Sequence, residues 1–124
     1  MIEQTVLIVE DDENIRELYF DALHSAGLNP IKAATGTEGV ELALEKHPRV
    51  IMMDIMLPDI SGHEAVRQIR ADSWGKDAKI LFLTNKSDPE DIVNAVEQGS
   101  EDYIVKAHTE IKEIINRVRL AMHA

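Results

Sequence analysis

A carboxylate at position 54 comes directly after an apolar run, which is a costly place for a charge. Residues 50–53 read Val-Ile-Met-Met, and Asp54 follows them. An ionised carboxylate loses its hydration when it is buried, so such a residue is expected where its charge is used. Asp54 is therefore the first candidate functional residue.

Three other apolar runs also end in polar side chains. The runs and the residues that follow them are 6–9 with Glu10, Asp11 and Asp12; 80–83 with Thr84; and 103–105 with Lys106. If these runs are parallel strands, their carboxyl ends lie on one edge of a sheet. Carboxylates, a hydroxyl and an ammonium group would then meet there, a combination that suits a divalent cation and a phosphoryl group.

Alternating strand and helix patterns would position these side chains. Strands are expected over residues 5–9, 29–33, 50–53, 79–83 and 102–105. They are mostly continuous apolar runs, which is typical of strands covered on both faces. Amphipathic helix patterns lie between them, and the first has its apolar stripe at Ile15, Leu18, Tyr19, Ala22, Leu23 and Ala26.

Local signals mark where several helices begin and end. Helix starts are indicated by Ser61 with Glu64, by Asp88 with Pro89, and by Thr109. Helix ends are indicated by Gly27 and Gly99, because glycine adopts the left-handed conformation at little cost.

This alternation predicts an α/β fold. We expect a flavodoxin-like (βα)5 domain with a doubly wound parallel sheet of strand order 2-1-3-4-5, formed by residues 1–124 as a single domain. Ligands bind such sheets outside the carboxyl ends of the strands, where the strand order reverses. Here that place lies between the first and third strands, which lead into Glu10 and Asp54.

The composition narrows the function classes. The 124 residues carry a net charge of −10, from 23 acidic and 13 basic residues, and contain no cysteine. The charge argues against nucleic-acid or anionic-lipid binding through this domain, and disulfide or thiolate chemistry is excluded. No apolar stretch approaches the roughly 18 residues of a membrane span, and no signal segment is evident at the N-terminus. We therefore expect a cytoplasmic protein with no membrane partner.

Four motifs together resemble the receiver domain of bacterial response regulators. They occupy residues 9–16 (Val-Glu-Asp-Asp-Glu-Asn-Ile-Arg), 54–62 (Asp-Ile-Met-Leu-Pro-Asp-Ile-Ser-Gly), 83–84 (Leu-Thr) and 102–106 (Asp-Tyr-Ile-Val-Lys). Each follows or ends an expected strand, and the resemblance covers essentially the whole chain.

The resemblance implies a magnesium-dependent phosphoacceptor site. Asp54 would be the phosphoacceptor and would form an aspartyl phosphate. Asp11 and Asp54 would bind Mg2+ directly, Glu10 would bind it through water, and the Met56 backbone carbonyl would add a further oxygen. A shift of one residue in the alignment would instead make Asp12 a ligand, and this alternative stays open.

The resemblance also implies a switch and its partners. Thr84 would donate a hydrogen bond to the phosphoryl group, and Lys106 would pair with that group and, before phosphorylation, with Asp54. In the family the threonine then moves and an aromatic side chain, here Tyr103, fills the vacated space. The output surface would comprise the helix between Asp88 and Gly99, the strand over 102–105 and the last helix. The expected partners are a histidine kinase or phosphotransfer protein and a downstream protein, for a signalling domain rather than an enzyme.

Two positions depart from the family pattern. Lys106 is followed by Ala107 where the family usually has proline, often after a cis bond, so the Lys106–Ala107 bond is either a strained cis bond or a trans bond. Asn85 follows Thr84 where a small residue is common, and it is expected to change the lifetime of the phosphoryl group.

Three other functions fit the sequence less well. An aspartyl phosphatase would carry its nucleophile after the first strand in an Asp-x-Asp arrangement, together with a lid. A flavin carrier would need a phosphate cradle where Glu10, Asp11 and Asp12 lie. A scaffold without phosphoryl chemistry would have no need of the complete set Glu10, Asp11, Asp54, Thr84 and Lys106.

Overall fold

The computed structural model describes residues 4–85, 102–106 and 109–123. Its strands are β1 (Thr5–Val9), β2 (Asn29–Ala33), β3 (Val50–Asp54), β4 (Ile80–Thr84) and β5 (Asp102–Val105). Its helices are α1 (Glu13–Ser25), α2 (Gly36–Lys46), α3 (Gly62–Ala71), the 3-10 helix η1 (Trp74–Asp77) and α5 (Ile111–Met122). The expected helix between Asp88 and Gly99 and the Lys106–Ala107 bond lie outside the described residues.

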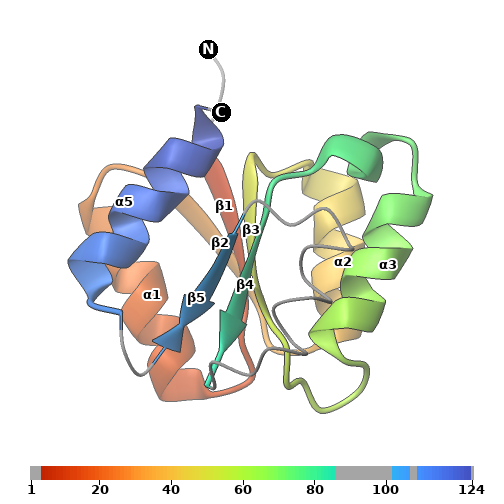
Figure 1. Ribbon diagram of the computed structural model, residues 1–124, viewed down its shortest axis with the longest axis horizontal. Helices are drawn as coiled ribbons and strands as arrows, with labels where there is room; N and C mark the ends of the chain where they lie inside the picture. Colours follow the sequence, from red (N-terminus) through yellow and green to blue (C-terminus); the bar gives the residue numbers. More distant parts are fainter. Residues whose placement is uncertain (1–3, 86–101, 107–108, 124) are drawn as a thin grey trace.

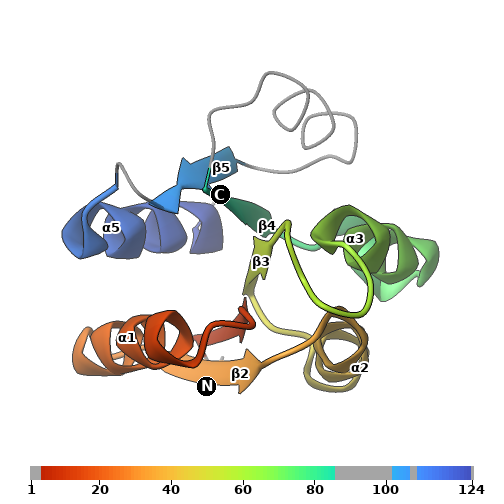
Figure 2. The same cartoon turned by 90° about the horizontal axis from the view of Figure 1, so that it is seen from below.

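The strands form one parallel sheet with the order β2-β1-β3-β4-β5, which confirms the predicted topology (Figure 1). The order reverses at β1, whose neighbours are β2 on one side and β3 on the other. Since all strands run the same way, their carboxyl ends share the edge that Figure 2 views from below.

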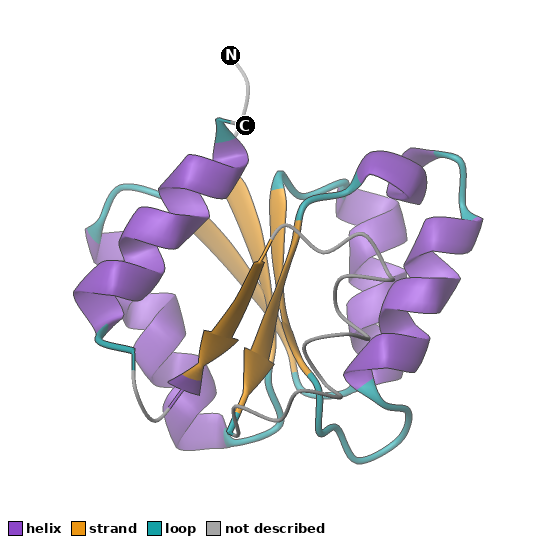
Figure 3. Ribbon diagram, viewed as in Figure 1, coloured by secondary structure: helices purple, strands orange, loops and turns teal. Residues whose placement is uncertain are grey.

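Helices cover both faces of the sheet, as Figure 3 shows. Helices α1 and α5 lie on one face, and α2 and α3 lie on the other. Alternate residues of the inner strands enter two apolar clusters, one on each face, which is why these strands lack a polar face. Leu7, Met53 and Phe82 belong to one cluster, and Ile8 and Met52 belong to the other.

Strand boundaries agree with the prediction to within one residue. Strand β3 includes Asp54 itself, because Asp54 pairs with Leu83 of β4. Strand β4 ends at Thr84, which pairs with Val105 of β5. The sheet ladder therefore fixes the backbone of both polar residues.

Two of the predicted helix boundaries are confirmed and one is wrong. The Ser61 side chain accepts from the Glu64 N–H at 3.1 Å, and Gly27 follows α1 with φ of 85°. Thr109 does not cap α5; its hydroxyl donates to the Val105 carbonyl of β5 at 2.8 Å. In the apolar stripe of α1, Tyr19 and Leu23 are buried, but Leu18 is 52% exposed.

Candidate phosphoacceptor site

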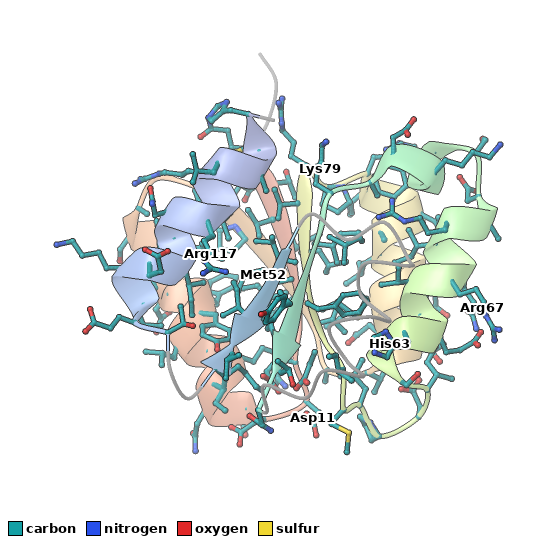
Figure 4. The ribbon with its side chains drawn as sticks, viewed as in Figure 1. Asp11, Met52, His63, Arg67, Lys79 and Arg117 are labelled. Carbon is teal, nitrogen blue, oxygen red and sulfur yellow. The ribbon has the colours of Figure 1, made fainter. Side chains whose placement is uncertain are left out.

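Carboxylates from two neighbouring strands meet at the carboxyl edge of the sheet. Glu10 follows β1 and is 0% exposed, Asp54 ends β3 and is 3% exposed, and Asp11 is exposed at the rim. One oxygen from each of the three lies within 4.8 Å of the others. Figure 4 labels Asp11 at this edge. The predicted acidic cluster is thus present, and it combines Glu10 and Asp11 with Asp54.

Lys106 joins two of these carboxylates. Its Nζ donates to Asp54 Oδ2 at 3.0 Å and to Glu10 Oε1 at 2.7 Å, and its side chain is only 8% exposed. The expected pairing with Asp54 is confirmed. The shorter contact with Glu10 was not predicted, because nothing local in the sequence connects residues 96 positions apart.

Burial and mutual charge set the electrostatics of the cluster. Burial and the nearby Asp54 carboxylate raise the pKa of Glu10, and Lys106 offsets part of that effect. Burial by itself would lower the pKa of Lys106, but its hydrogen bond to Glu10 and the charge of Asp54 outweigh burial and raise it. Three carboxylates face one ammonium group, so the site has an excess of negative charge that a cation would compensate.

The loop after β1 is held by contacts that separate the three consecutive acids. Asp12 caps α1, since its Oδ1 accepts from the Ile15 N–H at 3.1 Å. Arg16 Nη1 donates to the backbone carbonyl of Glu10 at 2.9 Å. The sequence motif includes Arg16 but does not predict this contact. Asp12 is therefore engaged as a helix cap and lies outside the acidic cluster.

The remaining predicted site residues lie around the same edge. The Met56 N–H donates to Asp54 Oδ1 at 3.0 Å, while the Met56 side chain is 73% exposed. Thr84 is 5% exposed at the end of β4, and Asn85 is exposed beside it. Tyr103 on β5 is half-buried and packs against the apolar cluster that contains Phe82.

Histidines of the described segments lie apart from this cluster. His47 stacks on Trp74 with ring centroids 4.5 Å apart, and His63 lies against the ring of Phe82 at 4.8 Å. Within residues 4–85, 102–106 and 109–123, the one group of acidic or histidine side chains close enough to share a metal is Glu10, Asp11 and Asp54. In the same part of the chain, every helix is too short or too polar to cross a membrane.

Comparisons with known proteins agree with this geometry. A family model described as the response regulator receiver domain matches residues 6–119. The DNA-binding response regulator MtrA of Mycobacterium tuberculosis is 34% identical over 118 residues, which are 95% of this chain and 50% of that protein. The phosphate regulon transcriptional regulatory protein PhoB of Escherichia coli is 32% identical over 117 residues, 94% of this chain and 51% of that protein. The chain thus spans about half the length of these curated relatives.

Solved structures extend the similarity to the whole fold. The chemotaxis protein CheY4 of Vibrio cholerae has a TM-score of 0.90 at 28% identity, covering 97% of this chain and 99% of that chain. The receiver domain of the sensor histidine kinase PA1611 of Pseudomonas aeruginosa has a TM-score of 0.90 at 28% identity, covering 99% of this chain and 100% of that chain. That second structure contains a magnesium ion coordinated in its active site cleft.

Proposed function

Because this chain belongs to the response regulator receiver domain family, the phosphoacceptor modules of two-component signalling, we propose that Asp54 is the residue that accepts the phosphoryl group. The observation that carries the proposal is the environment of its two oxygens. Oδ2 faces the Lys106 ammonium at 3.0 Å, and Oδ1 is held by the Met56 N–H at 3.0 Å. The carboxylate is therefore held in place at the carboxyl edge of the sheet, and Lys106 offsets part of its negative charge.

The proposed reaction is a single displacement at phosphorus. A bond forms between an Asp54 oxygen and phosphorus while the bond from phosphorus to the donor's leaving group breaks, and the leaving group keeps that electron pair. When the donor is a phosphorylated histidine, the leaving group is an imidazole nitrogen. Lys106 supplies a fixed positive charge next to the reacting oxygens, and preorganised charge of this kind stabilises the transition state.

The same residues fit a bound magnesium ion. Asp11 and Asp54 would hold it through carboxylate oxygens, the Met56 carbonyl would add another oxygen, and Glu10 would act through water. The contacts of Glu10 support a role through water rather than as a direct ligand, because its Oε1 already accepts from Lys106 and its Oε2 already accepts from the Asp12 N–H at 3.2 Å. When bound, the ion would neutralise charge on the phosphoryl oxygens.

We further propose that Thr84 and Tyr103 couple the site to an output surface. Thr84 would donate to the phosphoryl group, and Tyr103 would move as Thr84 does. In the described part of that surface, Arg117 Nη1 of α5 donates to the Tyr103 carbonyl at 2.9 Å, so a shift of β5 would reach α5 directly. Figure 4 shows Arg117 between α5 and β5. A downstream protein partner would bind this surface.

Membership of a two-component system implies a histidine kinase as the phosphoryl source. A phosphotransfer protein as an intermediate donor is a finer proposal that rests on the same chemistry. The net charge of −10 supports protein partners rather than nucleic acid for this domain.

Intact-mass measurement after incubation with acetyl phosphate and Mg2+ tests the proposal. We expect one hydroxylamine-labile phosphoryl group on the wild type, and none on Asp54→Ala or when Mg2+ is removed. Asp72→Ala, which removes an exposed carboxylate beyond the end of α3, is the matched control and should be phosphorylated normally. A folded wild type that takes up no phosphoryl group would overturn the proposal and favour a scaffold.

A further inference from the structure

The first backbone N–H groups of α2 are bound by side chains rather than by the helix itself. The opening N–H groups of any helix lack intrahelical partners. In α2, Thr35 Oγ1 accepts from the N–H of Glu38 at 3.1 Å. The Asp59 carboxylate binds the two preceding N–H groups: its Oδ1 accepts from the Gly36 N–H at 2.8 Å, and its Oδ2 accepts from the Thr37 N–H at 2.9 Å. This cap comes from a residue more than twenty positions away, in the loop between β3 and α3.

The Asp59 carboxylate is well suited to this contact although it is exposed. Hydrogen bonds from Thr37, through its side chain and its N–H, hold the pKa of Asp59 well below its usual range. A negative charge is also favoured at a helix N-terminus. Asp59 is therefore ionised at neutral pH.

The loop that carries Asp59 is attached at both its base and its tip. At the base, the Gly62 N–H donates to the Ile55 carbonyl at 2.9 Å. At the tip, Ile60 packs so closely on α2 that a Cβ added at Gly36 would lie 2.5 Å from Ile60 Cγ1. Figure 2 shows this loop passing beside the start of α2. Together with the Asp59 contacts, these attachments fix the path of residues 55–61.

Met56 lies on this loop between the base and the tip. Its N–H donates to Asp54 Oδ1 at 3.0 Å, so the loop backbone orients the carboxylate. The Met56 side chain is 73% exposed, and side-chain packing therefore does little to hold the residue in place. Its position depends on the attachments of the loop, and Asp59 supplies two of the hydrogen bonds that make them.

We infer that Asp59 is a positioning residue for the phosphoacceptor site: by binding the first two N–H groups of α2, it fixes the loop that presents the Met56 backbone to Asp54 and the metal. The inference rests on the proposed function of Asp54. It assigns Asp59 no contact with the phosphoryl group or the metal, because its oxygens are already bound to α2.

Two neutral substitutions separate positioning from simple loss of charge. Asp59→Asn keeps one acceptor oxygen and Asp59→Ala keeps none, yet both remove the same charge. Asp72→Ala is the matched control, since the exposed Asp72 also caps a turn, its Oδ1 accepting from the Trp74 N–H at 2.9 Å. The measurements are the Mg2+ dissociation constant by calorimetry, the acetyl phosphate rate, and hydrogen exchange of the Met56 amide without metal.

We expect Asp59→Ala to weaken Mg2+ binding roughly 3- to 10-fold. This is at or below the smallest loss of affinity that is typical when a residue that orients a metal ligand is removed. In Asp59→Ala the Met56 amide should exchange several-fold faster than in the wild type. The Mg2+ affinity of Asp59→Asn should lie between those of Asp59→Ala and the wild type. Saturating Mg2+ should restore most of the rate of phosphorylation by acetyl phosphate. Equal effects of the two Asp59 substitutions on Mg2+ binding, or a Met56 amide unchanged from that in Asp72→Ala, would overturn the inference. A wild type without Mg2+ binding or phosphorylation would overturn the proposed function instead, and the metal-free Met56 exchange would still decide the positioning role.

Discussion

At the scale of single residues, the site is a set of like charges held together by one lysine. Lys106 contacts Glu10 and Asp54, while Asp11 has no ion pair among the described residues. Like charges at this separation disfavour the folded state, and the usual reason to retain them is function. The residues that make the site useful should therefore cost stability in the metal-free protein.

Asp11→Asn should stabilise the metal-free protein in a pH-dependent way. Some loss of hydration and the neighbouring Glu10 raise the pKa of Asp11 above its unfolded value. A group whose pKa is raised on folding destabilises the folded state as it ionises, so the wild type should lose stability relative to the variant as the pH rises from about 4 to 7. Because Asp11 is exposed and screened by water, we expect a gain of only about 0.5 kcal/mol in the free energy of unfolding at neutral pH.

Urea denaturation of both proteins across this pH range measures the effect. Asp12→Asn is the control, since Asp12 caps α1 outside the cluster and an amide oxygen keeps the cap. Addition of Mg2+ should reverse the order, because it stabilises only the protein that binds it. A stability difference that does not change with pH would contradict the charge argument.

At the scale of elements, the phosphoacceptor strand and helix α3 depend on a close backbone contact. A Cβ added at Gly62 would lie 2.1 Å from the Asp54 carbonyl oxygen and 2.9 Å from Ile55 Cα. Both neighbours are backbone atoms of β3 or its continuation and have little freedom to move. The start of α3 therefore rests directly on the end of β3, with no side chain between them.

Gly62→Ala should destabilise the protein by about 2 kcal/mol or more, because overpacking against backbone cannot be relieved by a rotamer change. Gly27→Ala is the matched control. Gly27 has φ of 85° with nothing within 4 Å of an added Cβ, so only the left-handed backbone penalty of about 1 kcal/mol applies. Chemical denaturation gives both values. Equal losses of stability in the two variants would show that backbone conformation, rather than the close contact with β3, requires glycine at position 62.

Sequence patterns predicted the elements well because their signals are local. The alternating strand and helix patterns located each strand to within one residue, and Ser61 and Gly27 marked a helix start and a helix end. The same patterns predicted the acidic cluster, because the carboxyl ends of parallel strands lie at the same edge of a sheet. Thr109 was misassigned because a hydroxyl near a helix start can equally bind the preceding strand, as it does here with Val105.

Sequence patterns did not predict the contacts between segments that are distant in the chain. Asp59 lies in a motif that was recognised, but its partners are backbone amides of α2, which carry no side-chain signature. The contact of Lys106 with Glu10 likewise depends on how the residues that follow β5 and β1 come together in space. Leu18 fits the apolar period of α1 and is nevertheless exposed, because the stripe is wider than the face that the sheet covers.

At the scale of the whole molecule, the two ends of the sheet carry different groups. The carboxyl end carries Asp54 and its cluster. At the amino end, His47 precedes β3 and Trp74 precedes β4, and their rings stack at 4.5 Å with an interplanar angle of 8°. Figure 4 shows the separation, with Lys79 at the amino end and Asp11 at the opposite edge.

This separation predicts that the single tryptophan reports folding but not ligand binding. Emission from Trp74 should change on unfolding, because the stack with His47 is lost, and should stay unchanged when Mg2+ is added to the folded protein. Met56→Trp in a Trp74→Phe background places the fluorophore at the exposed rim of the site, where Mg2+ should change its emission. Titrating both proteins with Mg2+ under one set of conditions, with Asp11→Asn added to each as the metal-binding control, compares the two ends directly. If Trp74 responds as strongly as the tryptophan at the rim, the two ends of the sheet are coupled and this prediction is wrong.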